Sequence, residues 1–385
     1  MSINELYPHL SGGRRTEKGH SHPSSLISHP SSFNSSSELV GLVFELIPKK
    51  SAILFPHYTK TLHAWFLDQV RTLDPALSAS LHDDQSKKPF TLSGLEGKMD
   101  TQGQKLQLLC DQTYRWYLTA FSPTLVGWLA DWLQTLPPMI KLRYAPLQIQ
   151  SVSFALPPTT YRKLYQTPLA KTLSLSFVTP TSFRRKGHHL PLPLPFNVFQ
   201  SYLRRWNEFS GIPVDDEAFL EWVNESVLIN RHQLESVKVA AGKQGKVTGF
   251  LGSIEYGLPT EATKNRQFHR LFTALGQLAP YCGTGHKTTF GLGQTRLGWL
   301  SQPNSIETLL VQTLLAKRID QLMERLMQCQ KRTGGERAAK VCLTQATILA
   351  RQETGESLVA IADELQMPYE TVKTYAKRAR LKVKD

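Results

Sequence analysis

The order of predicted strands and helices repeats along this chain, and this repeat constrains the fold more than any other feature. Residues 38–48 are rich in branched apolar side chains and close on a proline, which is typical of a strand. A helix is predicted over 58–70, because Leu62, Phe66 and Val70 recur at helical spacing. The predicted order continues with two extended segments (88–95 and 105–110), a long helix (114–136) and a closing strand (148–154).

A second round follows in the same order. The alternating residues 172–178 predict its first strand, and a helix is predicted over 196–209. The remaining elements are two extended segments (236–241 and 246–256), a helix (266–278) and a last strand after residue 290. Strand, helix, strand, strand, helix, strand is the order of a ferredoxin-like unit. We therefore predict an α+β fold with two ferredoxin-like domains in tandem, residues 38–165 and 166–300.

Two segments of different character flank these domains. Residues 1–37 contain eleven serines and almost no periodic apolar pattern, so we expect a flexible arm. Residues 301–385 are helical in pattern throughout, with an amphipathic run over 307–331 and a break at Gly334 and Gly335. This last segment predicts a third, all-helical module.

Positive charge is the main clue to a partner. The chain has 45 Lys and Arg residues against 31 Asp and Glu residues, a formal net charge of +14. Such a surplus favours nucleic acid, although a basic protein without a polyanionic partner would also fit. The four cysteines are far apart and lack zinc-like spacing, so we expect no disulfide framework and no metal site. No apolar run approaches the roughly 20 residues of a membrane helix, and we expect a cytoplasmic protein with no membrane partner.

The most specific motif is a glycine-rich stretch over residues 281–296. Its glycines fall as G-x-G-x5-G-x-G, and a histidine and a lysine lie between them: Gly283, Gly285, His286, Lys287, Gly291 and Gly293. Glycine permits positive φ and close approach, so backbone N–H groups could meet the phosphates of a polyanion. The spacing matches neither a Walker loop nor the dinucleotide fingerprint, and no cofactor is expected. A tight glycine hairpin before the last strand would explain the pattern equally well.

Several separated segments together resemble the CRISPR-associated precursor-RNA processing endoribonucleases of the RAMP superfamily. They are the glycine-rich stretch 281–298, residues 173–183, the Leu-Pro-Leu-Pro run 192–195 with Phe199 and 204–207, and the pieces 62–64 and 88–93. The resemblance covers about residues 38–300. It implies two ferredoxin-like folds, a glycine-rich loop close to the RNA backbone, and metal-independent cleavage of a repeat transcript into guide RNAs.

Metal-free RNA cleavage needs groups that move protons. The 2′-hydroxyl is deprotonated, the 5′-oxygen is protonated, and the products end in a 2′,3′-cyclic phosphate and a 5′-hydroxyl. Imidazole suits both transfers because its ordinary pKa is about 6.5. His63 is the candidate acid or base, since the resemblance implies a histidine from the first helix; Lys60 at i−3 would hold the phosphate and Tyr58 would assist. Without the resemblance, the apolar residues that follow His63 would favour a packed core histidine; His57 is the nearest rival for the catalytic role.

Basic residues beside aromatic residues provide the RNA-binding candidates. Arg184, Arg185 and Lys186 follow a predicted strand, where a mobile loop could clamp a phosphate backbone. Arg204 and Arg205 could bind phosphate from a helix, although a solvated charged face would look the same.

The end of the chain, residues 357–382, has the spacing of a helix-turn-helix. Ala362 would lie where the two helices cross, and Gln366 stands where glycine is common at the turn. The segment resembles region four of sigma factors, and the residues that would face nucleic acid are Thr371, Lys373, Lys377 and Arg378. Three roles remain open for this segment: binding of duplex DNA, packing on the nuclease domains, or additional contacts with RNA.

These patterns together predict a CRISPR endoribonuclease whose partner is the CRISPR repeat RNA. Two alternatives stand beside it. One is a non-catalytic CRISPR-RNA-binding subunit, for which the subunits of a CRISPR effector complex are candidate partners. The other is a DNA-binding regulator that acts through the helical tail.

Overall fold

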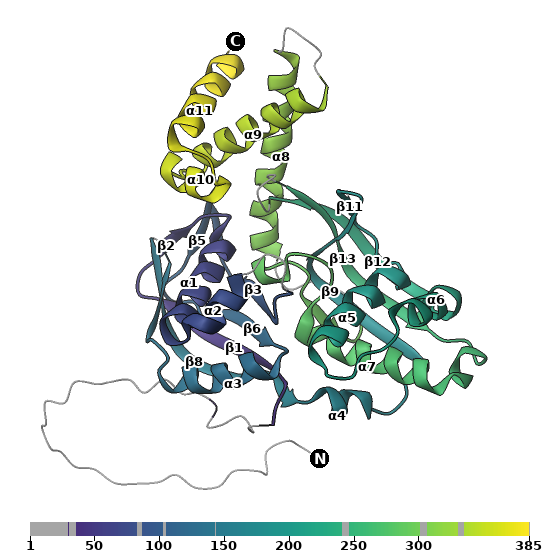
Figure 1. Cartoon of the computed structure of the whole chain (residues 1–385). Helices are drawn as coiled ribbons and strands as arrows, with labels where there is room; N and C mark the ends of the chain where they lie inside the picture. The colour runs from purple at the N-terminus through teal and green to yellow at the C-terminus, as the bar shows by residue number, and fades with distance from the viewer. Residues whose placement is uncertain are drawn as a thin grey trace, which may run out of the picture.

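The computed structural model describes residues 30, 36–82, 87–102, 105–142, 144–240, 246–300, 306–329 and 335–384. The arm predicted over 1–37 lies outside the described residues, apart from 30, 36 and 37. Two α+β units lie side by side, and a column of helices rises above and between them (Figure 1).

The first unit is built on a five-stranded antiparallel sheet in the order β3-β6-β1-β8-β7. Its strands are β1 (Leu39–Pro48), β3 (Phe90–Glu96), β6 (Tyr114–Ala120), β7 (Met139–Leu142) and β8 (Ala145–Thr159). The helices α1 (Tyr58–Leu73) and α3 (Pro123–Gln134) pack on the sheet, and α2 (Pro75–His82) follows α1. Their aromatic side chains fill the core, where Trp132 of α3 lies against Phe44 of β1. The strand order β3-β6-β1-β8 is that of a ferredoxin-like fold.

One element of this unit was predicted wrongly. Residues 114–120 form strand β6, whereas a helix was predicted to begin at Tyr114. Aromatic residues crowd this segment and fit either period, but the buried Tyr114 and Trp116 flank the exposed Arg115, as in a strand. The helix begins only at Pro123, after Ser122, whose hydroxyl accepts from the backbone N–H of Leu125.

The extended segment predicted over 105–110 also lies elsewhere than expected. It forms β5 (Lys105–Leu108), which pairs with β2 (Ala52–Leu54) and β4 (Asp100–Gln102) in a separate three-stranded sheet. The third strand of the ferredoxin-like order is therefore β6.

The second unit repeats the strand order of the first. Its sheet runs β12-β13-β9-β14, from β9 (Thr172–Thr181), β12 (Leu228–Val239), β13 (Val247–Gly257) and β14 (Thr295–Leu297). Its helices are α4 (Tyr161–Tyr165), α5 (Pro195–Phe209), α6 (Asp216–Ser226), α7 (Arg266–Cys282) and the short η1 (Ala262–Lys264) and η2 (Thr288–Phe290). Helix α6 was not predicted, although Asp215 caps it by accepting from two backbone N–H groups. Two tandem ferredoxin-like folds are confirmed.

The last part of the chain is helical, as predicted. It comprises α8 (Ile306–Gln328), α9 (Glu336–Glu353), α10 (Leu358–Leu365) and α11 (Tyr369–Lys384). Helix α8 is anchored to both units, because Val311 lies in the core of the first and the Gln312 carbonyl accepts from the N–H of Ala240 beside β12. Within the described part of the chain, no helix has the length and apolar character to cross a membrane.

Candidate active site and nucleic-acid interface

Two adjoining pockets at the junction of the two units form what we call the basic groove. Their volumes are about 470 and 490 Å³, and both are lined by Arg184, Lys287 and Phe290. The cationic residues of the two linings are Lys60, Lys87, Lys88, Arg184, Arg204, Arg205, Lys246 and Lys287. Glu364 of α10 is the one acidic residue among the described lining residues. The groove is therefore suited to a polyanion.

The glycine-rich segment 283–293, which we call the glycine loop, is shaped by close backbone contacts. All four of its glycines have left-handed φ, between 65° and 83°. A Cβ at Gly285 would lie 2.3 Å from the Ser182 carbonyl oxygen, and one at Gly293 would lie 2.1 Å from that of Thr284. Only glycine fits at these two positions.

The glycine N–H groups do not act as the sequence suggested. Each of the four donates to an acceptor inside the protein: Ala279 O, Ser201 Oγ, Leu92 O and Pro180 O. The expectation that these groups are exposed to phosphates is therefore wrong. The glycines instead let the loop fold back on itself and against the first unit, and the cations around the loop provide the positive charge.

His286 and Lys287, between the glycines, line the groove with shifted pKa values. Burial lowers the pKa of Lys287 to about 8. His286 donates from Nδ1 to the Ser182 carbonyl at 2.8 Å, and burial lowers its pKa to about 4, so its ring is neutral near pH 7. Its buried Nε2 has no hydrogen-bond partner among the described residues. His286 thus presents an unused acceptor atom, and Lys287 a cation that loses its charge at mildly alkaline pH.

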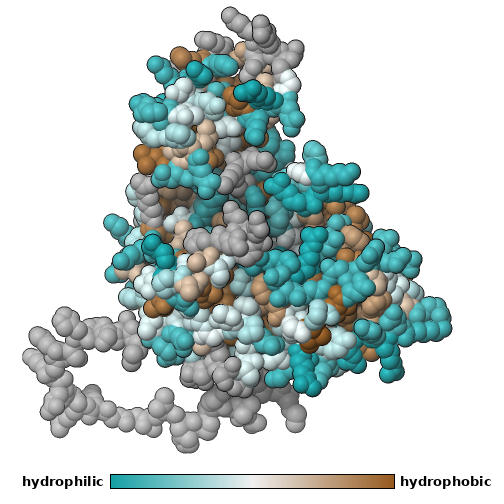
Figure 2. Space-filling view, viewed as in Figure 1, coloured by the Kyte–Doolittle hydropathy of each residue, from teal (hydrophilic) through white to brown (hydrophobic). Residues whose placement is uncertain are grey.

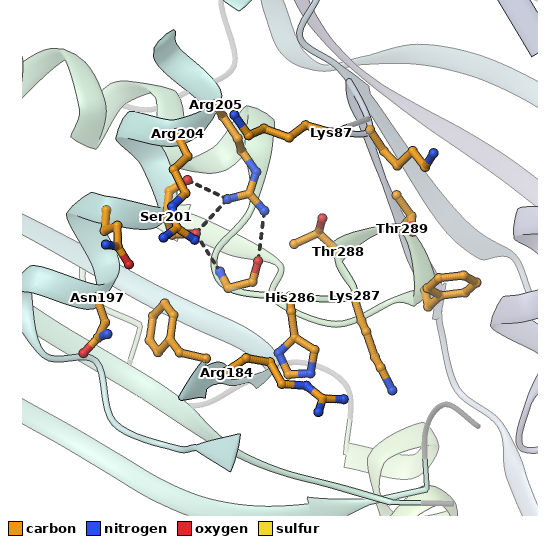
Figure 3. A pocket seen from close by; sticks show the side chains of 15 residues that line it. Lys87, Arg184, Asn197, Ser201, Arg204, Arg205, His286, Lys287, Thr288 and Thr289 are labelled. Atoms are coloured by element: carbon orange, nitrogen blue, oxygen red, sulfur yellow. Dashed lines mark hydrogen bonds between the residues drawn. The ribbon is translucent and has the colours of Figure 1, made fainter. Parts of the chain in front are cut away.

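Adjacent arginines of α5 have different roles (Figure 3). Arg205 donates to the carbonyl and the hydroxyl of Ser201, both at 2.7 Å, and to the carbonyl of Gly285 at 2.9 Å. It holds the glycine loop against α5. Arg204 also lines the groove, and its side chain is exposed. Of the predicted pair, Arg204 is the one available to a phosphate.

The basic residues 184–186 lie on a β-hairpin rather than a loop. Strands β10 (Phe183–Arg185) and β11 (His188–Leu190) are joined by Lys186 and Gly187, which have φ of 47° and 84°. Two successive left-handed residues are typical of a tight hairpin turn. Arg184 lines both pockets of the groove, whereas Arg185 and Lys186 are exposed at the hairpin tip and line neither.

His63 lies at the edge of the groove. Its half-buried ring is 4.4 Å from the ring of Phe290 and 5.9 Å from that of Phe90, measured between centroids. Phe290 lines both pockets, so His63 is next to the groove without lining it. His57 lines the second pocket, but burial and the cations Arg351, Lys60 and Lys287 hold its pKa well below the ordinary value.

The other two predicted catalytic residues, Tyr58 and Lys60, each have a partner inside the protein. Tyr58 is only 3% exposed, and its hydroxyl accepts from the backbone N–H of Leu95 at 2.8 Å. Lys60 lines the second pocket, but its ammonium group forms an ion pair with Glu364. Tyr58 is therefore buried, and its hydroxyl is used by the backbone. The joint action of Tyr58, Lys60 and His63 at one site stays a prediction.

Glu364 joins the helical region to the groove, a role that no sequence pattern predicted. Besides Lys60, it contacts Arg351 at 2.5 Å, and this arginine is buried and also pairs with Glu356. The partners Lys60 and Glu364 are 304 positions apart, so no local pattern could reveal the pair.

The tail residues singled out for nucleic acid lie apart from the groove. Thr371, Lys373, Lys377 and Arg378 are on α11, and none of them lines either pocket. The described residues also contain no group of three or more His, Cys, Asp or Glu that could hold a metal ion.

Two family models match the chain. "CRISPR Cas6 N-terminal domain" matches residues 40–154, and "CRISPR-associated endoribonuclease Cas6" matches residues 175–295. These matches coincide with the sheets of the two units, and together they span more than half of the chain.

Individual Cas6 proteins are similar over much of their length. The Streptococcus thermophilus CRISPR-associated endoribonuclease Cas6 is 24% identical over 237 residues, which is 61% of this chain and 89% of that protein. A Mycobacterium tuberculosis Cas6 is 26% identical over 35% of this chain and 42% of its own length. A solved Cas6 product complex is 26% identical, with a TM-score of 0.53, and covers 68% of this chain and 99% of that one. The chain belongs to the CRISPR-associated endoribonuclease Cas6 family.

Proposed function

We propose that this chain cleaves CRISPR repeat RNA in the basic groove between its two ferredoxin-like units. The observation that carries the proposal is the convergence of cations from β10, α5 and the glycine loop, in a member of an endoribonuclease family. A product complex and a substrate-mimic complex of one similar Cas6 support RNA as the ligand. We place this activity in the cytoplasm, where a repeat transcript is made.

His63 is proposed to transfer a proton in the cleavage step. The 2′-oxygen loses its proton and bonds to phosphorus, the bond to the 5′-oxygen breaks, and the 5′-oxygen takes up a proton. The position of His63 beside Phe290 supports this role. A solved histidine-to-alanine variant of a Cas6, 27% identical with a TM-score of 0.51, shows that a histidine has been singled out in a similar protein.

Lys287 and Arg184 are proposed to hold the scissile phosphate. Both line the two pockets of the groove. A cation beside the developing negative charge stabilises the transition state more than the ground state.

The direct test is incubation of the purified protein with repeat RNA in EDTA. We expect cleavage at one position, with a 2′,3′-cyclic phosphate and a 5′-hydroxyl on the products. Bound but intact RNA would instead support a non-catalytic RNA-binding subunit. Cleavage that requires added magnesium would contradict the metal-free step.

The adjacent arginines of α5 test whether the groove is where RNA binds. Arg204→Gln should weaken RNA binding and leave the thermal unfolding midpoint unchanged, because the side chain is exposed. Arg205→Gln should weaken RNA binding and also lower the unfolding midpoint, because it removes the hydrogen bond that holds the glycine loop against α5. If Arg204→Gln binds RNA as tightly as the wild type, RNA does not follow this wall of the groove.

A further inference from the structure

Helix α11 carries an exposed surface that the RNA groove does not use. Its buried side is formed by Val372, Ala376 and Ala379, which pack toward the other helices. Its opposite side, around Lys373 and Lys377, is exposed to solvent. With 16 residues the helix is about 24 Å long. It is therefore long enough to present several consecutive turns to a partner.

The packing of α10 and α11 sets the direction of this surface. Only three residues join the two helices, and the first of them, Gln366, has a left-handed φ of 54°. The N–H of Met367 then donates to the carbonyl of Ala362 at 3.0 Å, which closes the end of α10. Ile361 and Ala362 of α10 pack with Val372 of α11 and Ile348 of α9. A short turn between two helices, supported by a third helix, is the arrangement in which the second helix enters a DNA groove.

The last helix carries mostly positive charge. Residues 369–384 contain six Lys or Arg and one acidic residue, Glu370, which pairs with Lys373 at 3.4 Å. The acidic Glu356 and Glu364 are occupied by Arg351 and Lys60 on the side toward the first unit. Lys377 and Arg378 are exposed and have no ion-pair or hydrogen-bond partner within the described ranges. Figure 2 shows hydrophilic side chains interspersed with hydrophobic ones over the helical region in this view.

We propose that α11 binds duplex DNA through the major groove. Lys377 and Arg378 contact phosphates, and the start of the helix, around Tyr369 and Lys373, approaches the base edges. Duplex DNA fits better than duplex RNA, because the major groove of B-DNA is about 12 Å wide and admits a helix. The corresponding groove of A-form RNA is deep and narrow. This function is additional to RNA cleavage, and no residue of α11 lines either pocket of the basic groove.

The test measures DNA affinity and RNA cleavage on the same full-length proteins. Fluorescence anisotropy of a labelled mixed-sequence DNA duplex at low salt reports binding by the wild type and by Lys377→Glu/Arg378→Glu. We expect this double variant to bind at least about tenfold more weakly. Each cation that neutralises a phosphate contributes about 0.9 to the slope of log affinity against log salt, so the double variant should have a slope shallower by about 1.8. Cleavage of repeat RNA by the double variant should equal that of the wild type.

A matched control is available on the opposite side of the molecule. Arg162→Glu/Lys163→Glu reverses two adjacent exposed cations on α4 and should leave both DNA affinity and RNA cleavage unchanged. If Lys377→Glu/Arg378→Glu has a lowered unfolding midpoint, the milder Lys377→Gln/Arg378→Gln replaces it in the DNA-binding measurement.

Three outcomes would overturn the proposal. The first is that the wild type does not bind the duplex at low salt. The second is that both α11 variants bind the duplex as tightly as the wild type. The third is that the variants lose RNA affinity in parallel with DNA affinity, which would make α11 part of the RNA-binding surface. Because cleavage is assayed separately, failure of the DNA proposal is distinguishable from failure of the proposed nuclease function.

Discussion

The basic groove and the exposed side of α11 are both cationic, but they are built in different ways. The groove takes its side chains from β10, α5, the glycine loop and α1, and it buries Lys287 enough to lower its pKa to about 8. The α11 surface comes from one continuous helix, on which Lys373, Lys377, Arg378 and Arg380 are exposed. Desolvated charges act on a ligand at close range, whereas exposed charges are screened by salt. The same residue types can therefore support chemistry in one region and long-range attraction in the other.

Glu364 connects these two regions. It comes from the helical region, enters the lining of the groove and pairs with Lys60. The helical region therefore neutralises one cation of the groove while presenting its own cations outward.

The largest expected effect is on the chemistry in the groove. His63→Ala should lower the cleavage rate by about 10²–10⁴-fold, because a proton-transfer group is lost. RNA affinity should change little, since His63 lies beside Phe290 rather than in the pocket lining. Single-turnover cleavage and equilibrium RNA binding check the two parts. Full activity in His63→Ala, with loss in His57→Ala, would move the proton transfer to His57.

Next in size is the dependence of the groove on its glycines. Gly285→Ala should destabilise the protein by roughly 3 kcal/mol, from left-handed strain and a clash with the Ser182 carbonyl. The control is Gly187→Ala at the hairpin turn. It has a similar φ of 84° but open space around it, and should cost only about 1–2 kcal/mol. Urea unfolding measures both, and equal losses would show that the close approach at Gly285 is unimportant.

Breaking the connection between the two regions should have a smaller effect. Glu364→Gln removes a charged partner from Lys60 and from buried Arg351, and should destabilise by about 1–3 kcal/mol. RNA affinity should rise a few-fold, since the groove loses its acidic lining residue. Asp363→Asn, an exposed neighbour on α10, is the control for a general charge effect. An equal rise in both variants would mean that the ion pair with Lys60 does not matter.

The smallest expected effect is a change in pH dependence. Burial lowers the pKa of Lys287 to about 8, so the lysine is charged below that pH and loses its charge above it. The value of kcat/KM reports groups of the free enzyme, and it should decline above about pH 8. Lys287→Arg keeps the charge and should move the decline to higher pH. An unchanged pH profile in this variant would assign the decline to another group.

Much of the fold could be predicted because local patterns agreed with the tertiary structure. The alternation over 172–178 was enough to predict β9, and the spacing of Leu62, Phe66 and Val70 was enough to predict α1. The segment of β6 was misassigned because its large aromatic side chains suit a buried helix as well as a buried strand. Only pairing with β1 and β3 selects the extended form.

The candidate site was less predictable than the fold. The glycine pattern and the position of Arg184 pointed to the right place, but the roles of individual atoms did not follow from them. Arg205 differs from Arg204 only because its guanidinium reaches the Gly285 carbonyl. Tyr58 differs from His63 only because its side of α1 faces the core.

The sequence by itself determined most strands and helices of the two units, the glycine loop and the basic last helix. Each of these depends on residues close together in the chain, through periodicity or backbone conformation. The tertiary structure decided which cations are free for a ligand and which are occupied, because burial and ion pairs such as Lys60 with Glu364 join residues far apart in the chain. The availability and the pKa of a charged group depend on its neighbours in space, and residue type alone does not set them.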